Sequence, residues 1–149
     1  MRAADVDSGC NEAAVTVVSG PLAGPVLGRV VGMLAARADC PIDRLDDALL
    51  VADAVAAKAA SFSDDGRVSV LVSAEIGSVE LLVGPLRPNG AEDLVDSAAL
   101  PGVGNVLERV ADELDPEHRG DGGAEYLRIR LGFDAQRPSM IDRMGSDAS

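Results

Sequence analysis

Few side chains in this 149-residue sequence could do chemistry, and their spacing does not group them. The two cysteines, Cys10 and Cys40, lack the CxxC spacing of a metal or redox pair, and the single histidine, His118, is far from both along the chain. A zinc site would need more ligands. We therefore expect two reduced thiols, with Cys40 partly buried beside a helix start. A disulfide or a redox role is the alternative.

Three pairs of adjacent carboxylates raise the question of metal binding or acid–base catalysis. They are Asp46-Asp47, Asp64-Asp65 and Glu92-Asp93. Neighbouring residues in a helix do not face each other, and turns favour aspartate for local hydrogen bonds, so we interpret the pairs as caps or solvated charge. His118 lies in a polar stretch without a partnered nucleophile, and no serine lies in a GxSxG elbow, so a hydrolase triad is not predicted.

The overall charge restricts the classes of partner. A formal net charge of −12 repels nucleic acid and anionic membranes, and a basic protein surface is the easier match. The apolar stretches at residues 26–36 and 48–60 are interrupted well short of the roughly 20 residues that cross a bilayer. Asp5 and Asp7 stand where a secretory signal would have a basic start and an apolar run. We expect a cytoplasmic protein without membrane or direct nucleic-acid contact.

Hydrophobic periodicity places these residues on predicted elements. Residues 1–11 and 134–149 lack an apolar period and are predicted tails, which leaves one domain over residues 12–133. Residues 13–18 predict a strand, and apolar residues at helical spacing predict a helix from Pro21 to about Ala38. A second helix is predicted to begin with Asp43 as its N-cap and to run to Phe62.

The second half of the chain predicts a hairpin, a helix and a last strand. Residues 67–74 and 78–83 alternate around a short turn, which indicates an antiparallel hairpin. Residues 91–100 could hold a short helix or an ordered loop. Pro101 is expected to open a helix that continues through Leu114 and ends at Pro116, and residues 125–133 predict a half-buried strand. This order predicts an α+β fold, a two-layer sandwich of a mostly antiparallel sheet with helices on one face.

The layout, together with the stretches RLDDALLVADAVAAKAASF and LPGVGNVLERVADELD, resembles the small anti-sigma-factor kinases of the GHKL (Bergerat) ATPase family. The resemblance covers residues 13–133. In that family the second helix carries a Glu that orients water and, four residues later, an Asn that holds the magnesium ion of the nucleotide. Ala54 and Lys58 stand at these positions here. A methyl group cannot polarise water, and an ammonium group has no lone pair for a metal, although Lys58 could still contact phosphate.

The nucleotide-binding loops of the family are only partly matched. The Asp that reads the adenine amine is missing from the stretch between Gly84 and Gly90, where two prolines stiffen the loop. The second glycine motif is better preserved, as Pro101-Gly102-Val103-Gly104-Asn105, and its backbone N–H groups could hold phosphate at a helix start. The candidate nucleotide contacts are Lys58, Gly102, Gly104 and Asn105, and ATP with magnesium stays open as a cofactor.

The resemblance and the charge together predict a regulatory binding protein. It would resemble an anti-sigma factor and sequester a sigma factor or bind an anti-anti-sigma-type antagonist, with little or no catalysis. The acidic surface would attract a basic, DNA-binding partner. One alternative is an active ATP-dependent serine-protein kinase that uses Asp53 and Lys58 in place of the usual pair. Another is a homodimer that serves as a structural subunit of a larger regulator.

Overall fold

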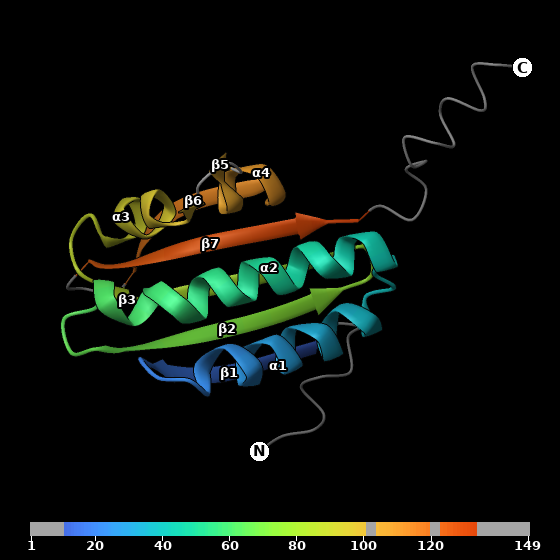
Figure 1. The fold of residues 1–149 in the computed structure, drawn as a ribbon, viewed down its shortest axis with the longest axis horizontal. Helices are drawn as coiled ribbons and strands as arrows, with labels where there is room; N and C mark the ends of the chain where they lie inside the picture. The colour runs from blue at the N-terminus through green and yellow to red at the C-terminus, as the bar shows by residue number, and fades with distance from the viewer. Residues whose placement is uncertain (1–10, 101–103, 120–122, 134–149) are drawn as a thin grey trace, which may run out of the picture.

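The computed structural model describes residues 11–100, 104–119 and 123–133, and the predicted tails lie almost wholly outside this part. One layer is a five-stranded antiparallel sheet with the strand order β1-β2-β3-β7-β6. The second layer is formed by the helices, which cover one face of the sheet (Figure 1). The protein therefore has the predicted α+β fold, with helices packed on one side of an antiparallel sheet.

The burial of side chains alternates along β1, β2 and β7, whereas the central part of β3 is buried on both faces and β6 is mostly exposed. The strands are β1 (Asn11–Val18), β2 (Arg67–Glu75), β3 (Ser78–Leu86), β6 (Glu113–Arg119) and β7 (Ala124–Gly132). Val70, Val83 and Leu127 lie opposite one another across β2, β3 and β7, and all three are buried. Because side chains alternate along a strand, every second residue faces the helices and completes an aliphatic core.

Two long helices form most of the helical layer. These are α1 (Ala23–Arg37) and α2 (Ile42–Lys58), and a 3-10 turn, η2 (Ala59–Phe62), extends α2. Gly28 and Gly32 of α1 face Leu49 of α2, and a Cβ on either glycine would lie 4.0 or 3.8 Å from a Leu49 methyl group. These are ordinary van der Waals distances, and Leu27 and Val51 are fully buried between the two helices and the sheet.

The sequence left open whether residues 91–100 form a short helix or an ordered loop. Most of the segment of residues 91–100 forms a short helix, α3 (Gly90–Ser97). A two-residue ribbon, β4 (Ala99–Leu100) with β5 (Gly104–Asn105), leads into α4 (Val106–Val110). The predicted N-cap of α2 was wrong, because Pro41 occupies that position and Asp43 lies in the first turn.

The prediction of one long helix from Pro101 to Leu114 was also wrong. The helix α4 has five residues, and the chain then forms β6, in which Leu114 lies opposite Ile129 and Pro116 opposite Leu127. β6 is an edge strand, where a proline without an N–H group is tolerated. Arg130 Nη1 lies 3.3 Å from Glu113 Oε2 across the pair. Pairing with β7, rather than local periodicity, therefore decides the structure of this segment.

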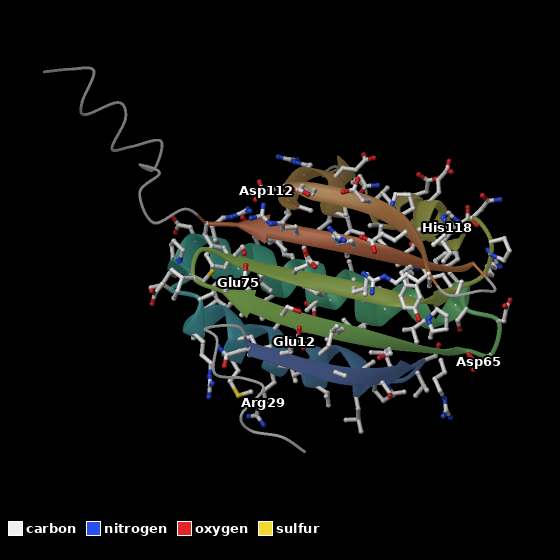
Figure 2. All side chains as sticks on the ribbon, turned by 180° about the vertical axis from the view of Figure 1, so that it is seen from behind. Glu12, Arg29, Asp65, Glu75, Asp112 and His118 are labelled. Atoms are coloured by element: carbon white, nitrogen blue, oxygen red, sulfur yellow. The ribbon has the colours of Figure 1, made fainter. Side chains whose placement is uncertain are left out.

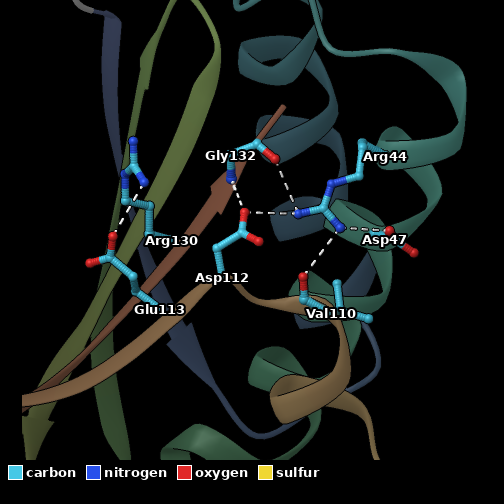
Figure 3. A network of polar contacts seen from close by, with 7 residues as sticks. All are labelled: Arg44, Asp47, Val110, Asp112, Glu113, Arg130 and Gly132. Atoms are coloured by element: carbon cyan, nitrogen blue, oxygen red, sulfur yellow. Dashed lines mark hydrogen bonds and ion pairs between the residues drawn. The ribbon is translucent and has the colours of Figure 1, made fainter. Parts of the chain in front are cut away.

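Arg44 ties the start of α2 to the end of the sheet (Figure 3). Its Nη1 donates to Asp47 Oδ2 at 2.8 Å and to the carbonyl of Val110 at 3.2 Å. Its Nη2 donates to Asp112 Oδ2 at 3.2 Å and to the carbonyl of Gly132 at 3.3 Å. Since one guanidinium group joins α2, the end of α4 and β7, it fixes the orientation of α2 against α4.

Candidate functional site

Two hollows lie beside the segment that runs from α3 to α4, one on the side of α2 and one on the side of β6. The first has a volume of about 220 Å³. Its lining includes Asp53, Ala54, Ala57 and Lys58 of α2, with Ala98 and Val106 opposite. Ala54 and Lys58 therefore share one face of α2, as residues four apart on a helix do. The wall is mainly methyl groups, with a carboxylate and an ammonium group at its rim.

Lys58 is the last residue of α2, and its side chain is exposed. Within the part of the chain that the structure describes, no ion pair or hydrogen bond holds its ammonium group. Asp53 is exposed as well, and its Oδ1 lies 3.6 Å from the position that a Cβ on Gly24 would take. The Asp53 carboxylate thus lies over the start of α1, and Lys58 lines the same hollow.

The predicted glycine motif lies only partly within the described residues. Gly102 is outside them, and Gly104 is an exposed residue of β5 with a φ of +89°. Asn105 uses both ends of its amide, since Nδ2 donates to the Val95 carbonyl at 2.6 Å and Oδ1 accepts from the Glu108 N–H at 3.1 Å. The Asn105 side chain therefore caps α4 and joins it to α3, which is a structural role.

Both ends of the stretch between Gly84 and Gly90 contact β7. The ring of Tyr126 lies against Gly84, and the start of α3 follows directly. Glu125 is the only buried charged residue among those described. Its Oε1 accepts from the Asn89 N–H at 2.9 Å and its Oε2 from the Ala91 N–H at 2.8 Å. Glu125 thereby satisfies two backbone donors at the first turn of α3.

The second hollow is an acidic groove that the sequence analysis missed. It has a volume of about 350 Å³ and lies between α3, α4 and β6. Its lining includes the carboxylates of Glu92, Asp96 and Glu108 and the apolar side chains of Val95, Leu114 and Leu127. The three carboxylates are exposed, and none of them is ion-paired to another described side chain. The groove escaped prediction because β6 was expected to be part of a helix, although the alternation of Glu113, Asp115 and Glu117 is a strand signal.

A polar pocket of about 470 Å³ lies at one end of the sheet, where Figure 2 shows His118 and Asp65. His118 is 65% exposed, as expected for a surface histidine, and its Nε2 lies 3.5 Å from Glu125 Oε1. Asp65 Oδ1 accepts from the Arg67 N–H at 3.1 Å, so this carboxylate serves the turn as predicted. The Asp65 and Glu125 carboxylates of the pocket thus have local structural partners.

Cys40 is half-buried between α1 and α2, which agrees with the prediction, whereas Cys10 lies outside the described residues. The Cys40 thiol donates to the Pro41 carbonyl at 3.4 Å. Burial raises the pKa of the Cys40 thiol, while the nearby Arg44 guanidinium opposes this shift. Among the described residues, no three His, Cys, Asp or Glu side chains are arranged to hold a metal ion.

Comparison with protein-family models finds no match, and a search of curated protein sequences finds none either. No helix in the described part of the chain is long and apolar enough to span a bilayer.

Proposed function

We propose that this protein is a regulatory binding module, similar to an anti-sigma factor, that holds a basic segment of a protein partner in the acidic groove between α3, α4 and β6. A sigma factor or an anti-anti-sigma-type antagonist is the partner that the resemblance favours. The observation that carries the proposal is a set of three carboxylates, of Glu92, Asp96 and Glu108, that surround an apolar floor and form no ion pair with another described side chain.

The chemistry of the groove fits a basic amphipathic segment. Val95 and Leu114 are half-buried, so a partner that covers them removes apolar surface from water. The exposed carboxylates surround this floor and can pair with lysine or arginine side chains of the same segment. A net charge of −12 adds long-range attraction to a basic partner, which raises the rate of encounter.

The hollow beside α2 is poorly suited to hold and process a nucleotide. At about 220 Å³ it is smaller than the roughly 300–1,000 Å³ of typical small-molecule sites. Ala54 and Lys58 line it, and they are the residues that the resemblance to the GHKL kinases aligns with the Glu and the Asn. A methyl group and an ammonium group supply neither a base for water nor a ligand for magnesium.

The proposal is tested by the affinity for purified sigma factors and their antagonists from the same genome. Three neutral substitutions, Glu92→Gln, Asp96→Asn and Glu108→Gln, should together weaken binding about tenfold, because exposed ion pairs contribute roughly 0.5 kcal/mol each. A matched control removes three exposed carboxylates elsewhere, with Asp64→Asn, Asp65→Asn and Glu75→Gln. Equal loss of affinity in both variants would mean that net charge, not the groove, holds the partner.

A second candidate function is an ATP-dependent serine-protein kinase. One observation favours it, namely that Asp53 and Lys58 line the same hollow, so that a carboxylate and a cation are both present there. Titration of the protein with ATP and magnesium separates the two candidates. The binding module predicts no heat and no thermal shift, whereas micromolar affinity with phosphate transfer to an antagonist that is lost in Asp53→Asn would establish the kinase.

A further inference from the structure

The two edges of the sheet differ in how they are protected from pairing. β6 carries Pro116 and a charged residue at almost every other position, and both features discourage the addition of a strand. β1 is the opposite edge strand, with eight residues of which only Glu12 is charged and none is proline. Within the described residues no strand pairs with its outer edge, so a row of backbone N–H and C=O groups is open there.

Apolar side chains surround this open edge. Val18, Val26 and Met33 are 47%, 47% and 55% exposed, and Leu22 is 73% exposed. A hollow of about 290 Å³ lies between β1 and the start of α1 and includes Leu22 and Val26 in its lining. In Figure 1 α1 lies alongside β1 at the margin of the molecule.

The charge of this margin differs from that of the rest of the chain. Arg29 and Arg37 are the only charged residues of α1, so the helix has no carboxylate although the protein has a net charge of −12. Figure 2 shows Arg29 at the β1 side of the molecule. A second acidic copy is repelled least along this margin, because charges farther away than about 8 Å are largely screened at physiological salt.

We propose that the β1 edge binds the β1 edge of a second copy, so that two sheets join into one. Identical strands that pair antiparallel are related by a two-fold axis normal to the sheet, which makes the interface self-complementary. The same axis places both α1 helices on one face, with the exposed Leu22, Val26 and Met33 side chains of the two copies directed at each other. The dimer buries apolar surface and open backbone groups together.

The register of β1 specifies which residues meet. Side chains that lie directly opposite in an antiparallel pair point to the same face of the sheet. The strand can therefore shift against its copy only in steps of two residues. In the register centred on Val15, Ala13 meets Val17 on the helix side and Glu12 meets Val18 on the open side. This register uses residues 12–18 and leaves Asn11 free for its hydrogen bond from Arg37 Nη1, of 3.0 Å.

This register also gives the interface charge complementarity. Val18 lies opposite Arg67 in β2, so Glu12 of one copy falls in the same row as Arg67 of the other. Two strand spacings separate their backbones, or about 10 Å, which two long side chains can bridge. The symmetry forms this ion pair twice. The acidic groove lies beside β6, at the far edge of the sheet, so the dimer leaves both grooves open.

The mass of the full-length protein in solution tests the proposal. Light scattering coupled to gel filtration should give twice the 15.2 kDa of one chain at micromolar concentration. Val26→Asp with Met33→Asp should raise the dimer dissociation constant at least 100-fold. The control Ile42→Asp with Ile76→Asp changes two exposed apolar residues away from this edge and should leave it unchanged. A monomeric wild type, or a dimer that survives Val26→Asp with Met33→Asp, would overturn the proposal.

A charge exchange tests the register without touching the apolar surface. Glu12→Arg and Arg67→Glu should each raise the dissociation constant about tenfold, and the double variant should restore the wild-type value. Both residues are exposed, so folding should not be affected, and circular dichroism checks this. Additive losses in the double variant would refute the pairing centred on Val15.

Discussion

The Oε2 atom of Glu125, in β7, accepts a hydrogen bond of 2.8 Å from the backbone N–H of Ala91, in the first turn of α3. This contact links the sheet to the helix that separates the two hollows. Because Glu125 is buried and also accepts from Asn89, the orientation of α3 depends on one carboxylate far from it in sequence.

Loss of the Glu125 carboxylate should loosen α3. Glu125→Ala leaves two backbone donors without their partner and should lower the free energy of unfolding by about 2–4 kcal/mol. Glu125→Gln keeps one acceptor and should cost about half as much. Urea unfolding measures the loss, and hydrogen exchange should locate it in α3. Glu75→Gln, at an exposed position, is the control and should change stability by less than about 0.5 kcal/mol.

Removal of the Arg44 guanidinium should destabilise the joint between α2 and the sheet. Arg44→Ala breaks four contacts of a side chain that is 24% exposed, and we expect a loss of about 2 kcal/mol in the free energy of unfolding. Arg44→Lys should recover only part of this, because an ammonium group cannot reproduce the planar fork. Arg29→Ala, on the exposed face of α1, provides the baseline. Equal stability of Arg44→Ala and Arg29→Ala would contradict the structural role of the network.

Two glycine substitutions should change stability in opposite directions. A Cβ on Gly84 would overlap the Tyr126 ring, with Cε2 only 2.8 Å away, so Gly84→Ala should cost about 1–3 kcal/mol. A Cβ on Gly28 would meet its nearest neighbour at 4.0 Å, so Gly28→Ala should be neutral or stabilise α1 by about 0.5–1 kcal/mol. Thermal unfolding of the two variants compares them directly, and a stabilising Gly84→Ala would show that the sheet packs differently.

The Cys40 thiol should react slowly at neutral pH. Burial raises its pKa, and only the thiolate attacks an alkylating reagent. In a Cys10→Ser background, iodoacetamide should modify folded protein more slowly than urea-unfolded protein, and the folded rate should rise only at alkaline pH. Because the Cys40 thiol ionises at a lower pH in the unfolded protein than in the folded protein, raising the pH destabilises the fold. The contribution of this thiol to stability is fully present below the unfolded pKa and is lost as the pH rises through the folded pKa. Equal rates for folded and unfolded protein at pH 8 would exclude the raised pKa.

The sequence predicted the parts of the fold whose patterns are local. The strands around Val70 and Leu81 were found because alternation and a short turn together indicate a hairpin, and they pair as expected. The two long helices were found from their apolar stripes. The helix predicted through Leu114 ends at Val110, because Leu114 fits the apolar spacing of that helix but pairs with Ile129 of β7 as part of a strand.

The sequence also predicted only part of the candidate site. That Ala54 and Lys58 share a face follows from helix geometry alone. The capping role of Asn105 and the acidic groove could not be inferred, because both depend on contacts between α3, α4 and β6. A site that is formed by several short segments leaves no periodic signal in the sequence.

The surface that a partner covers is the most direct test of the proposed function. Hydrogen exchange of the protein, measured with and without its purified sigma factor or antagonist, maps that surface. We expect added protection in α3, α4 and β6, around Glu92, Asp96 and Glu108, and none at the Asp64-Asp65 turn. Protection confined to other elements, with α3 and β6 unchanged, would contradict the account.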